Sequence, residues 1–599
     1  MKMRILLIAI VLTVCVQGAV FAKGIIEERN ALSDASRSEA DQILERVPAI
    51  YEDARYGEAV DLLQKNKELF MKAGDQYYAK SVSWQGLLYF SMKDYVKAET
   101  CYKELCDLNI RLINQNFSSM SEERRGLYME NVLQDFEACY SLSLKYPTES
   151  LNGLNYNNAM FTKGLLLRTA VAERARASSS LRDMSADAVT RWQDVQNSLR
   201  QGEAAVEFVS FNVYDVIWTD TVQYAALVIK QDSKAPVLVQ LCDEEKLQNI
   251  LGKVGNRSSY EKVRILYNSN NGRELYDILW KPLEKELTGV TTVYYSPSGL
   301  LHKIAFNALP IDDSFEKRLA DKYNLSLVSG TREIVRLSKK RTQTVQINSA
   351  VLYGGLDYDA DEKEMRKAAQ LYKKDTGVTR GMGWNPLPGT LEEVLAIQKI
   401  LKSKKIPNTL YKGSLGNEES FKNLDGKKTW LIHLATNSFY IKDIERNSDN
   451  KEQRYSTIWT AENPMLRSGI ILAGVNHAWT NKPIEGVEDG ILFADEIANL
   501  NLFGTELVTL SGCESMLGDI HRSEGVYGLQ RAFKLAGVNT LIMSLWEVDD
   551  KTTSLLMSVF YKEWLVSGKS MQEALKEAQN KVRAKYPGLY YWAAFVIMD

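Results

Sequence analysis

The chain has 599 residues, of which 45% are hydrophobic and 25% are charged, the composition of ordinary globular proteins. Because one hydrophobic core rarely serves more than about 250–300 residues, this length predicts more than one domain. The net charge of −2 and the lack of a Lys/Arg tract exclude the basic surface that nucleic-acid binding needs, so no nucleic-acid partner is expected.

The first residues have the pattern of a secretory signal peptide. Lys2 and Arg4 form a basic start, an apolar run over residues 5–16 follows, and Val20 and Ala22 are small residues before a cleavage site. The apolar run is short for a membrane anchor, which is the alternative, and no later run reaches spanning length. We expect residues 1–22 to be removed and the mature protein to be periplasmic or extracellular.

Residues 25–185 are predicted to form an all-α domain of tetratricopeptide-like repeats. A Tyr-x-x-Ala pattern that begins at Tyr56 recurs at Tyr95, within a segment rich in Ala, Leu, Glu, Lys and Tyr. Gly86 and Tyr89 precede the second copy at the spacing of the first helix of such a repeat, in which Gly and Ala allow two helices to cross closely and Tyr fills the space between them. Because about three repeats are needed to bury their faces, the helices after residue 120 are expected to complete the stack.

Beyond residue 200 the pattern changes to short β-rich runs that alternate with helices. We predict two halves of an α/β domain, residues 200–345 and 346–599. The alternation indicates a mostly parallel sheet covered by helices on both faces. In the second half the predicted strands are 350–354, 430–435, 469–472, 507–510 and 540–545, and the predicted helices are 525–535, 552–566 and one that begins at Thr390. Thr390 and Glu393 have the spacing of a capping box for that helix.

Two of these strands end in residues that could carry chemistry. The run at 507–510 leads to Gly512 and Cys513, and the run at 430–435 leads to Asn437 and Ser438. Because the carboxyl ends of neighbouring parallel strands meet in one crevice, we expect Asn437 and Cys513 to face the same cleft. A thiol with an imidazole opposite would form a Cys–His dyad in which the imidazole is the base.

Seven segments, in this order along the chain, resemble the motifs of a known family. They are Tyr295–Phe306, Leu387–Glu393, Ile432–Asn437, Leu510–Gly518, Glu524–Phe533, Ala536–Trp546 and Tyr590–Phe595. Together they resemble the CHAT domain, a caspase-like cysteine peptidase module of clan CD that is often fused to tetratricopeptide repeats. The resemblance covers roughly residues 200–599. It implies a caspase-like, mostly parallel sheet flanked by helices, preceded here by the helical repeat domain.

The resemblance also implies roles for individual residues. Cys513 takes the position of the family's nucleophile. The family reads His-x-Ala-Thr-His-Gly at the other strand, with the second histidine as base, and here Asn437 and Ser438 stand in place of that His-Gly pair. An amide cannot accept and return a proton, and a thiol of pKa ~8.5 is only a few per cent thiolate near pH 7. Ser438 and Gly512 are the predicted substrate-binding residues, although a serine disfavours the sharp turn that the family's glycine permits.

The chain contains four histidines that could in principle supply a base in place of the family's histidine. His521 is nearest to Cys513 in sequence, on the segment before Glu524, and is the one candidate. His433 lies four residues before the strand tip, about 13 Å away at ~3.3 Å per residue, which favours packing. His302 and His477 are expected to be structural.

The cysteines and histidines do not have the spacing of a zinc site, so no metal or other cofactor is predicted. After residue 22 the cysteines are Cys101, Cys106, Cys139, Cys242 and Cys513. Because their number is odd, at least one thiol is free. Cys101 and Cys106 are five positions apart in a helical pattern, which directs their side chains to different faces.

These inferences predict an exported CHAT-type protein, catalytically impaired, that binds a protein or peptide ligand. Two alternatives stay open: an active cysteine endopeptidase that uses Cys513 with His521 as base, and a structural adaptor in which the helical repeats bind the partner. The charged segment between Tyr440 and Pro464 is expected either to overhang the crevice or to be a surface loop without a role. The sequence specifies neither the ligand nor the oligomeric state.

Overall fold

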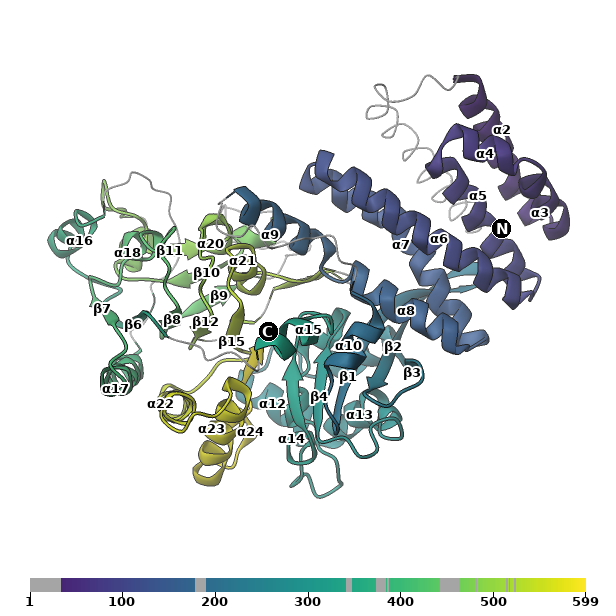
Figure 1. Cartoon of the computed structure of the whole chain (residues 1–599). Helices are drawn as coiled ribbons and strands as arrows, with labels where there is room; N and C mark the ends of the chain where they lie inside the picture. Colours follow the sequence, from purple (N-terminus) through teal and green to yellow (C-terminus); the bar gives the residue numbers. More distant parts are fainter. Residues whose placement is uncertain are drawn as a thin grey trace. The chain divides into compact units, whose positions relative to one another are not determined.

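The computed structural model describes residues 34–177, 190–340, 347–372, 384, 387–441, 463–480, 482–512, 515–516, 518–521 and 524–599. The predicted signal peptide, Cys513 and most of the charged segment after Tyr440 lie outside these residues. The described residues form two compact units that interleave along the chain (Figure 1). The first contains residues up to 159 together with 210–227 and 234–243, and the second contains residues 160–209, 228–233 and 244–599. The domain ranges expected from the sequence stay predictions.

The first unit consists mainly of helices. In chain order they are α2 (Asp34–Glu52), α3 (Tyr56–Lys65), α4 (Lys67–Ala73), α5 (Asp75–Ser91), α6 (Tyr95–Asn116), α7 (Glu122–Lys145) and α8 (Glu149–Thr162). Side chains cap two of them: Asp94 accepts the Lys97 amide at 3.3 Å before α6, and the Ser121 hydroxyl accepts the Arg124 amide at 3.4 Å before α7. A β-carbon on Gly86 would lie 2.7 Å from the Tyr102 ring, so the expected glycine–tyrosine packing between α5 and α6 is confirmed.

The ends of two long strands belong to the core of this helical unit. They are the end of β1 (Glu203–Asp215) and the beginning of β2 (Ile217–Lys230), joined by a tight turn. The Tyr214 hydroxyl lies 3.1 Å from the Ser91 hydroxyl, and its ring packs edge-on against Phe90 at 5.1 Å. The hairpin tip therefore packs on α5.

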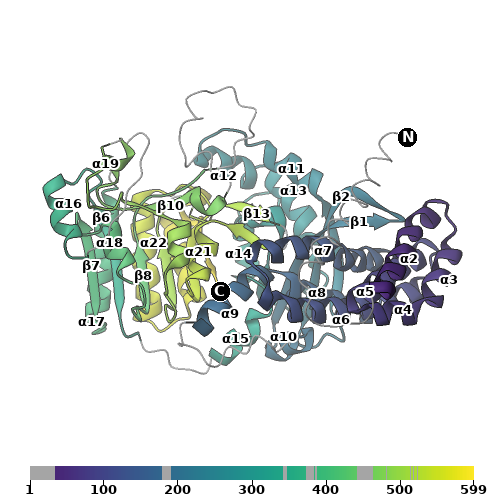
Figure 2. The same ribbon diagram turned by 90° about the horizontal axis from the view of Figure 1, so that it is seen from above.

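A mostly parallel sheet, seen from above in Figure 2, forms the centre of the second unit, whereas its strand at 237–243 and parts of β1 and β2 count with the first unit. In the described part of the chain the strand order is β3-β2-β1-β4-β5-β16-β15-β12-β8-β6-β7. The further strands are β3 (Val237–Asp243), β4 (Thr292–Ser296), β5 (Asn324–Leu327), β6 (Ala350–Leu356), β7 (Asn408–Gly413), β8 (Leu431–Leu434), β12 (Leu507–Leu510), β15 (Thr540–Ser544) and β16 (Phe595–Met598). From β1 to β7 the neighbours are parallel except for β15 and β16. The predicted fold class is confirmed.

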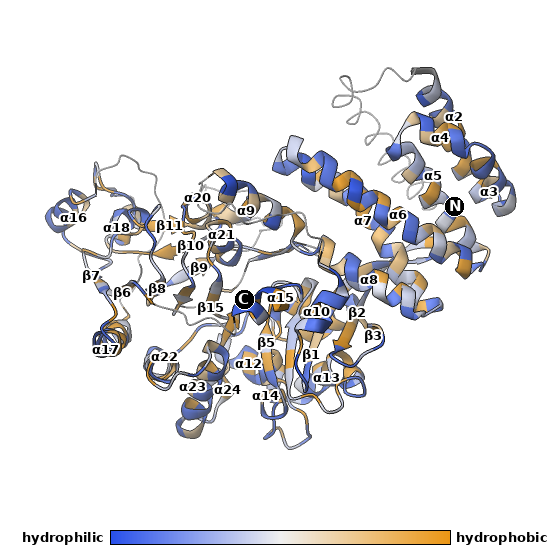
Figure 3. Cartoon of the chain, viewed as in Figure 1, coloured by the Kyte–Doolittle hydropathy of each residue, from blue (hydrophilic) through white to orange (hydrophobic). Residues whose placement is uncertain are grey.

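Helices cover both faces of this sheet. They are α9 (Leu165–Ala177), α10 (Trp192–Ser198), α11 (Glu244–Gly252), α12 (Ser259–Tyr267), α13 (Asn270–Leu279), α14 (Leu319–Lys322), α15 (Glu333–Lys340), α16 (Glu362–Ala369), α17 (Gly389–Ser403), α18 (Glu418–Lys422), α19 (Val475–Trp479), α20 (Ala494–Asn499), α21 (Leu529–Leu535), α22 (Asp550–Leu565), α23 (Met571–Lys585) and α24 (Leu589–Trp592). Helices α17 and α22 lie on one side of β8 and β12, and α20 and α21 lie on the other (Figure 1). Figure 3 shows hydrophilic residues on α10 and α23 and hydrophobic segments in the strands.

The predicted capping box at the start of α17 is wrong. The Thr390 hydroxyl accepts the Gly355 amide at 3.0 Å and donates to the Leu387 carbonyl at 2.6 Å, so it serves β6 and the preceding loop. Glu393 turns into the sheet and meets Nε2 of His433 at 2.7 Å. Both side chains are buried, and a buried polar group takes whichever partner the packing offers.

Two smaller sheets lie apart from the large one. Strands β9 (Ser438–Tyr440), β10 (Ser468–Ile471) and β11 (Ile491–Phe493) form an antiparallel sheet, and β13 (Asp519–His521) pairs with β14 (Gly525–Tyr527). The strand predicted at 469–472 exists as β10, but its expected place in the parallel sheet is wrong, and so is the helix start predicted at 525. Gly525 has a φ of 81°, and the helix begins only at Leu529.

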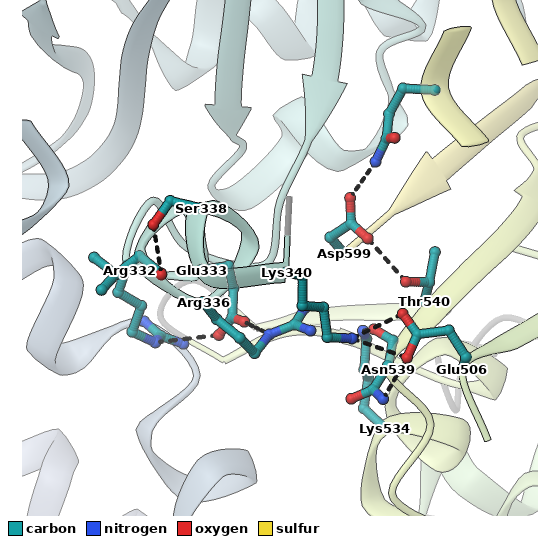
Figure 4. Close-up of polar contacts among 12 residues, drawn as sticks. Arg332, Glu333, Arg336, Ser338, Lys340, Glu506, Lys534, Asn539, Thr540 and Asp599 are labelled. Carbon is teal, nitrogen blue, oxygen red and sulfur yellow. Dashed lines mark hydrogen bonds and ion pairs between the residues drawn. The ribbon is translucent and has the colours of Figure 1, made fainter. Parts of the chain in front are cut away.

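A polar network joins α15 to the strands of the second half of the sheet (Figure 4). Lys340 contacts both carboxylate oxygens of Glu506 at 2.8 Å, and Asn539 donates to the same group at 2.9 Å. The Asp599 side chain accepts from Thr540 at 2.8 Å. Burial lowers the pKa of the nearby Lys534 to about 8. These contacts link α15 to the residues that precede β12 and β15.

Candidate functional site

The candidate site lies at the carboxyl ends of β8 and β12, which are parallel neighbours. Their register pairs Leu434 with Leu510, the last residue of each strand. Asn437 follows β8 by three residues, and Gly512 follows β12 by two, so both lie at the same edge of the sheet. Cys513, the next residue, lies outside the described residues. The strands that carry the predicted site are therefore adjacent and point the same way.

Gly512 occupies a place where only a glycine fits. A β-carbon there would overlap the carbonyl oxygen of Thr436 and lie 3.4 Å from the Ser438 hydroxyl. The Gly512 carbonyl accepts a hydrogen bond from the Ser544 hydroxyl at 2.6 Å, which ties it to β15. The backbone after β12 thus packs directly on the backbone after β8. The structure brings Gly512 and Ser438 together, the two residues predicted to bind substrate.

Asn437 is held by its own backbone and by a buried tyrosine. Its amide donates to the Tyr358 hydroxyl at 3.3 Å, its side-chain Nδ2 lies 3.5 Å from the same oxygen, and its carbonyl accepts the Ile471 amide at 2.9 Å. The Tyr358 hydroxyl is also 2.8 Å from Thr436 Oγ1. Burial raises the pKa of Tyr358, so the phenol stays protonated at neutral pH. The described side chain that Asn437 contacts, Tyr358, is consequently no base.

His433 sits deep in the sheet, on the same strand as the site. It is fully buried, and its Nε2 and Nδ1 lie 2.7 Å from Glu393 and 3.1 Å from the Tyr561 hydroxyl. Tyr561 also meets Thr509 of β12 at 3.1 Å. Both ring nitrogens are thus occupied in the core, which confirms the packing role expected for this histidine.

The other three histidines have different surroundings. His521 is exposed at the end of β13, where its ring packs on Tyr527 with centroids 4.3 Å apart. The Nε2 of His477 lies 2.8 Å from the Ala360 carbonyl, a structural contact as expected. His302 is half-buried near Gly525, and desolvation lowers the pKa of its imidazole to about 3, so it is neutral at physiological pH. Of these, only His521 is open to solvent beside the segment that follows Gly512.

An ion pair that sequence reasoning missed ties the two sides of the site together. Asp519, the first residue of β13, accepts hydrogen bonds from the Arg467 guanidinium and from the Tyr440 hydroxyl. Arg467 is 1% exposed and also donates to the Ile441 carbonyl at 3.1 Å. Because Tyr440 follows Asn437 on β9 and Asp519 follows Gly512, this clamp fixes one strand extension against the other. Arg467 and Asp519 are 52 positions apart, so no local pattern indicates it.

Glu524 holds the opposite side of the β13–β14 hairpin. Its carboxylate accepts the amides of Leu166 and Leu167 at 2.9 and 3.2 Å, in the first turn of α9. It also pairs with Arg531 at 3.2 Å, whose guanidinium lies 4.1 Å from the centre of the Tyr527 ring. A carboxylate satisfies the free amides at a helix start and suits its dipole. The Glu-Gly motif was visible in the sequence, but its capping role was not.

A buried acidic cluster supports the small sheet next to the site. The Lys422 ammonium contacts three carboxylates, those of Glu418 at 2.7 Å, Glu496 at 2.7 Å and Glu488 at 3.1 Å. Glu418 also accepts the Gly490 amide at 2.9 Å, immediately before β11. Burial raises the pKa of Asp489 to about 7 and that of Glu418 well above its ordinary value. Part of this cluster is therefore protonated in acid and ionises near neutral pH.

Neither a metal centre nor a membrane helix is found within the described ranges. No group of three or more His, Cys, Asp or Glu residues there could hold a metal ion. The helices described there are too short or too polar to cross a bilayer.

The chain is similar to proteins of known family and structure. The CHAT domain family matches residues 269–599, more than half of the chain. Tetratricopeptide repeat protein 28 of Mus musculus is 23% identical over 225 residues, which are 36% of this chain and only 9% of that relative's length. A chain of the Saccharomyces cerevisiae separase–securin complex has a TM-score of 0.40 and 10% identity over 94% of this chain and 48% of that one.

A fourth similarity is to gingipain R (RgpB), an Arg-specific cysteine proteinase of Porphyromonas gingivalis. It has a TM-score of 0.32 and 8% identity, over 59% of this chain and 74% of that one. The match to the family runs from before β4 to the end of β16. It therefore contains Asn437, Gly512, Asp519 and Glu524.

Proposed function

Because the chain belongs to the CHAT domain family, we propose that it is a peptidase-like protein that has lost its catalytic base and binds a protein or peptide segment in the cleft of the former active site. In this proposal Cys513 holds the nucleophile position and Asn437 the position of the base. One observation carries it: Asn437, at the edge of the sheet where β8 and β12 both end, has an amide side chain, and the hydroxyl that it contacts, that of Tyr358, is kept protonated by burial.

The missing step is proton transfer. Hydrolysis by a thiol needs a base that takes the thiol proton and later gives a proton to the leaving amine. Asn437 can do neither, and the nitrogens of His433 are already engaged by Glu393 and Tyr561. Loss of one member of a nucleophile–base pair lowers the rate by orders of magnitude.

A cleft of this kind remains suited to binding. The Asp519–Arg467–Tyr440 clamp and the Glu524 cap support both sides of the site with buried polar contacts. A pre-organised site loses less conformational entropy when a peptide binds, so affinity is retained without chemistry. The Asn437 side chain can then donate to, or accept from, a peptide backbone. The helical unit adds a repeat-like surface for the rest of a protein partner.

The test uses the whole mature chain and a library of peptides from digested cell proteins. We expect no cleavage that depends on Cys513, while peptides retained by the protein are lost when Asn437 is changed to Ala. Cys101→Ala, a change of a half-buried thiol in the helical unit, is the matched control. Cleavage by the wild type that Cys513→Ala abolishes would overturn the proposal. In that case His521→Ala tests whether that imidazole is the base.

Export is part of the same proposal, and it rests on the signal-like pattern of residues 1–22. Mass spectrometry of the protein expressed from its first methionine in a Gram-negative host should find Lys23 as the first residue, in the periplasmic or extracellular fraction. An intact first methionine or a lipid on Cys15 would contradict it.

A further inference from the structure

Two thiols meet in the core of the helical unit. Cys106 on α6 and Cys139 on α7 are both 0% exposed, and their sulfur atoms lie 3.5 Å apart. The two residues are 33 positions apart on consecutive helices that pack on one another. The spacing of the two cysteines in the sequence does not indicate this contact, because only the packing of α6 against α7 brings them together.

We propose that Cys106 and Cys139 form a disulfide bond that links α6 to α7 when the chain folds in an oxidising compartment. The sulfurs of a disulfide are about 2.05 Å apart, so these two must approach by roughly 1.5 Å. Rotation about the Cα–Cβ bonds moves each sulfur while the helices keep their neighbours. The bond depends on the helical unit alone and is independent of the chemistry at Cys513.

The contacts around the sulfurs favour this pair. Asn158 of α8 donates to the Cys106 sulfur at 3.2 Å, and the Cys139 sulfur donates to the Asp135 carbonyl at 3.3 Å, so both side chains are oriented from outside the pair. Cys101, the other thiol of α6, is half-buried and five positions earlier, on a different face of the helix. It is therefore the competitor that the packing disfavours.

The reaction is a thiol–disulfide exchange with a protein or small-molecule disulfide as oxidant. The thiolate of one cysteine attacks the disulfide of the oxidant, which forms a mixed disulfide and releases one thiol. The thiolate of the second cysteine then attacks the protein sulfur of this mixed disulfide, which forms the Cys106–Cys139 bond and releases the other thiol. Two protons and two electrons pass to the oxidant, and the chain loses two hydrogen atoms. No other co-reactant is needed.

Burial decides when the bond can form. Burial raises the pKa of Cys139 well above its ordinary value, so the folded protein holds almost no thiolate there. The unfolded chain exposes both sulfurs to the oxidant. We therefore expect oxidation during folding, whereas the folded, reduced protein resists the same oxidant. This behaviour separates a structural disulfide from an exposed redox sensor.

The test is to refold the full chain from denaturant in a mixture of reduced and oxidised glutathione. Peptide mapping without reduction should recover one cross-linked pair that contains Cys106 and Cys139. The oxidised form should melt roughly 5 °C or more above the reduced form. Folded, reduced protein incubated with oxidised glutathione should stay reduced.

Two variants control for folding. Cys106→Ala with Cys139→Ala should keep the helical circular dichroism signal but lose the difference between oxidised and reduced melting. Cys101→Ala should behave as the wild type. Free, alkylatable Cys106 and Cys139 in the refolded wild type, or a cross-link to another cysteine, would overturn the proposal without reference to any variant.

Discussion

The side chain of Asn437 lies against Tyr358, and this contact defines the chemistry available beyond the end of β8. The phenol donates to Thr436 Oγ1 and accepts from Asn437, so it has a fixed orientation. An imidazole at position 437 would meet the same hydroxyl and would have its other nitrogen free for a thiol. A histidine introduced at this position therefore tests whether the missing base is the one defect of the proposed site.

We expect Asn437→His to increase the rate at which iodoacetamide alkylates Cys513 at pH 7 by about tenfold, because a neighbouring imidazole favours the thiolate. Peptide mapping measures this rate separately from that of Cys101. Asn437→Gln keeps an amide and should react like the wild type. Adding Ser438→Gly should increase peptide hydrolysis further if the oxyanion pocket is also impaired, since one lost donor there costs ~3 kcal/mol. Equal alkylation in all variants would show that position 437 does not face the thiol.

At the scale of elements, the site depends on how the ends of β8 and β12 pack and on what holds their extensions. Gly512 has no space for a side chain beside Thr436, and Asp519 joins β13 to β9 through Arg467 and Tyr440. Close backbone packing is disrupted by an added side chain, whereas a buried ion pair is disrupted by the loss of one charge. Each can be tested with a matched substitution.

Gly512→Ala should separate the two strand ends and destabilise the protein by roughly 2 kcal/mol, since an added β-carbon overlaps backbone that cannot move alone. Urea unfolding followed by tryptophan fluorescence measures the loss. Gly252→Ala is the control, because a β-carbon there would meet nothing within 4 Å. If Gly512→Ala left the free energy of unfolding unchanged, the backbone at this edge of the sheet would be less closely packed than the contacts indicate.

Asp519→Asn should destabilise the protein by about 3 kcal/mol, because it leaves the buried Arg467 guanidinium without its counter-charge. Hydrogen exchange should become faster at β9 and β13, and peptide retention should decrease. The matched control is Asp313→Asn, whose carboxylate pairs with Arg273 at 3.3 Å but is 94% exposed, and which should change stability by less than ~0.5 kcal/mol. Equal effects of the two changes would show that the Asp519–Arg467 ion pair does not stabilise the site.

At the scale of the whole molecule, buried ionisable groups in both units make stability depend on pH. In the helical unit, burial raises the pKa of Asp135 to about 6, although its oxygens accept from Ser83 and Asn109 at 2.6 and 2.8 Å. In the sheet unit, burial raises the pKa of Asp489 to about 7 and lowers that of His302 to about 3. The carboxyl groups with raised pKa values and the imidazole with a lowered pKa make the stability change with pH in opposite directions.

For Asp489 the sign follows from proton binding. The unfolded chain releases this proton near the ordinary value of 3.8, and the folded protein keeps it to about pH 7. Between these values the folded state binds more protons, so the stability that Asp489 contributes is present in acid and is lost as the pH rises through 7. His302 works the other way, because its contribution is lost as the pH falls below about 6.5.

Urea unfolding of the wild type and of Asp489→Asn at pH 5, 6, 7 and 8 separates these effects. The advantage of the wild type over the variant should shrink as the pH rises, because the amide does not ionise. His302 contributes equally to both proteins and cancels. A difference that grows with pH would contradict the raised pKa. Burial lowers the pKa of Lys534 to about 8, so this lysine titrates at the upper end of the window, but it is present in both proteins and its effect also cancels.

Much of the fold could be predicted from local patterns. Apolar runs that end in polar residues marked β8 and β12 and placed Asn437 and Gly512 at their ends, because a strand buried on both faces leaves a short continuous apolar run in the sequence. The predictions failed where partners far along the chain decided the outcome. Glu393 took His433 instead of a capping role, and the run at 469–472 paired with β9 and β11. Local spacing contains no information about such partners.

The sequence by itself determined the order of the main helices and strands, the family motifs and the amide at position 437, since each is a property of neighbouring residues. Only the tertiary structure decided the Asp519–Arg467 clamp, the Glu524 cap and the meeting of Cys106 with Cys139. The members of these contacts are 52, 358 and 33 positions apart. They meet because apolar surfaces elsewhere bring their elements together, and buried polar groups then pair with whatever lies in reach.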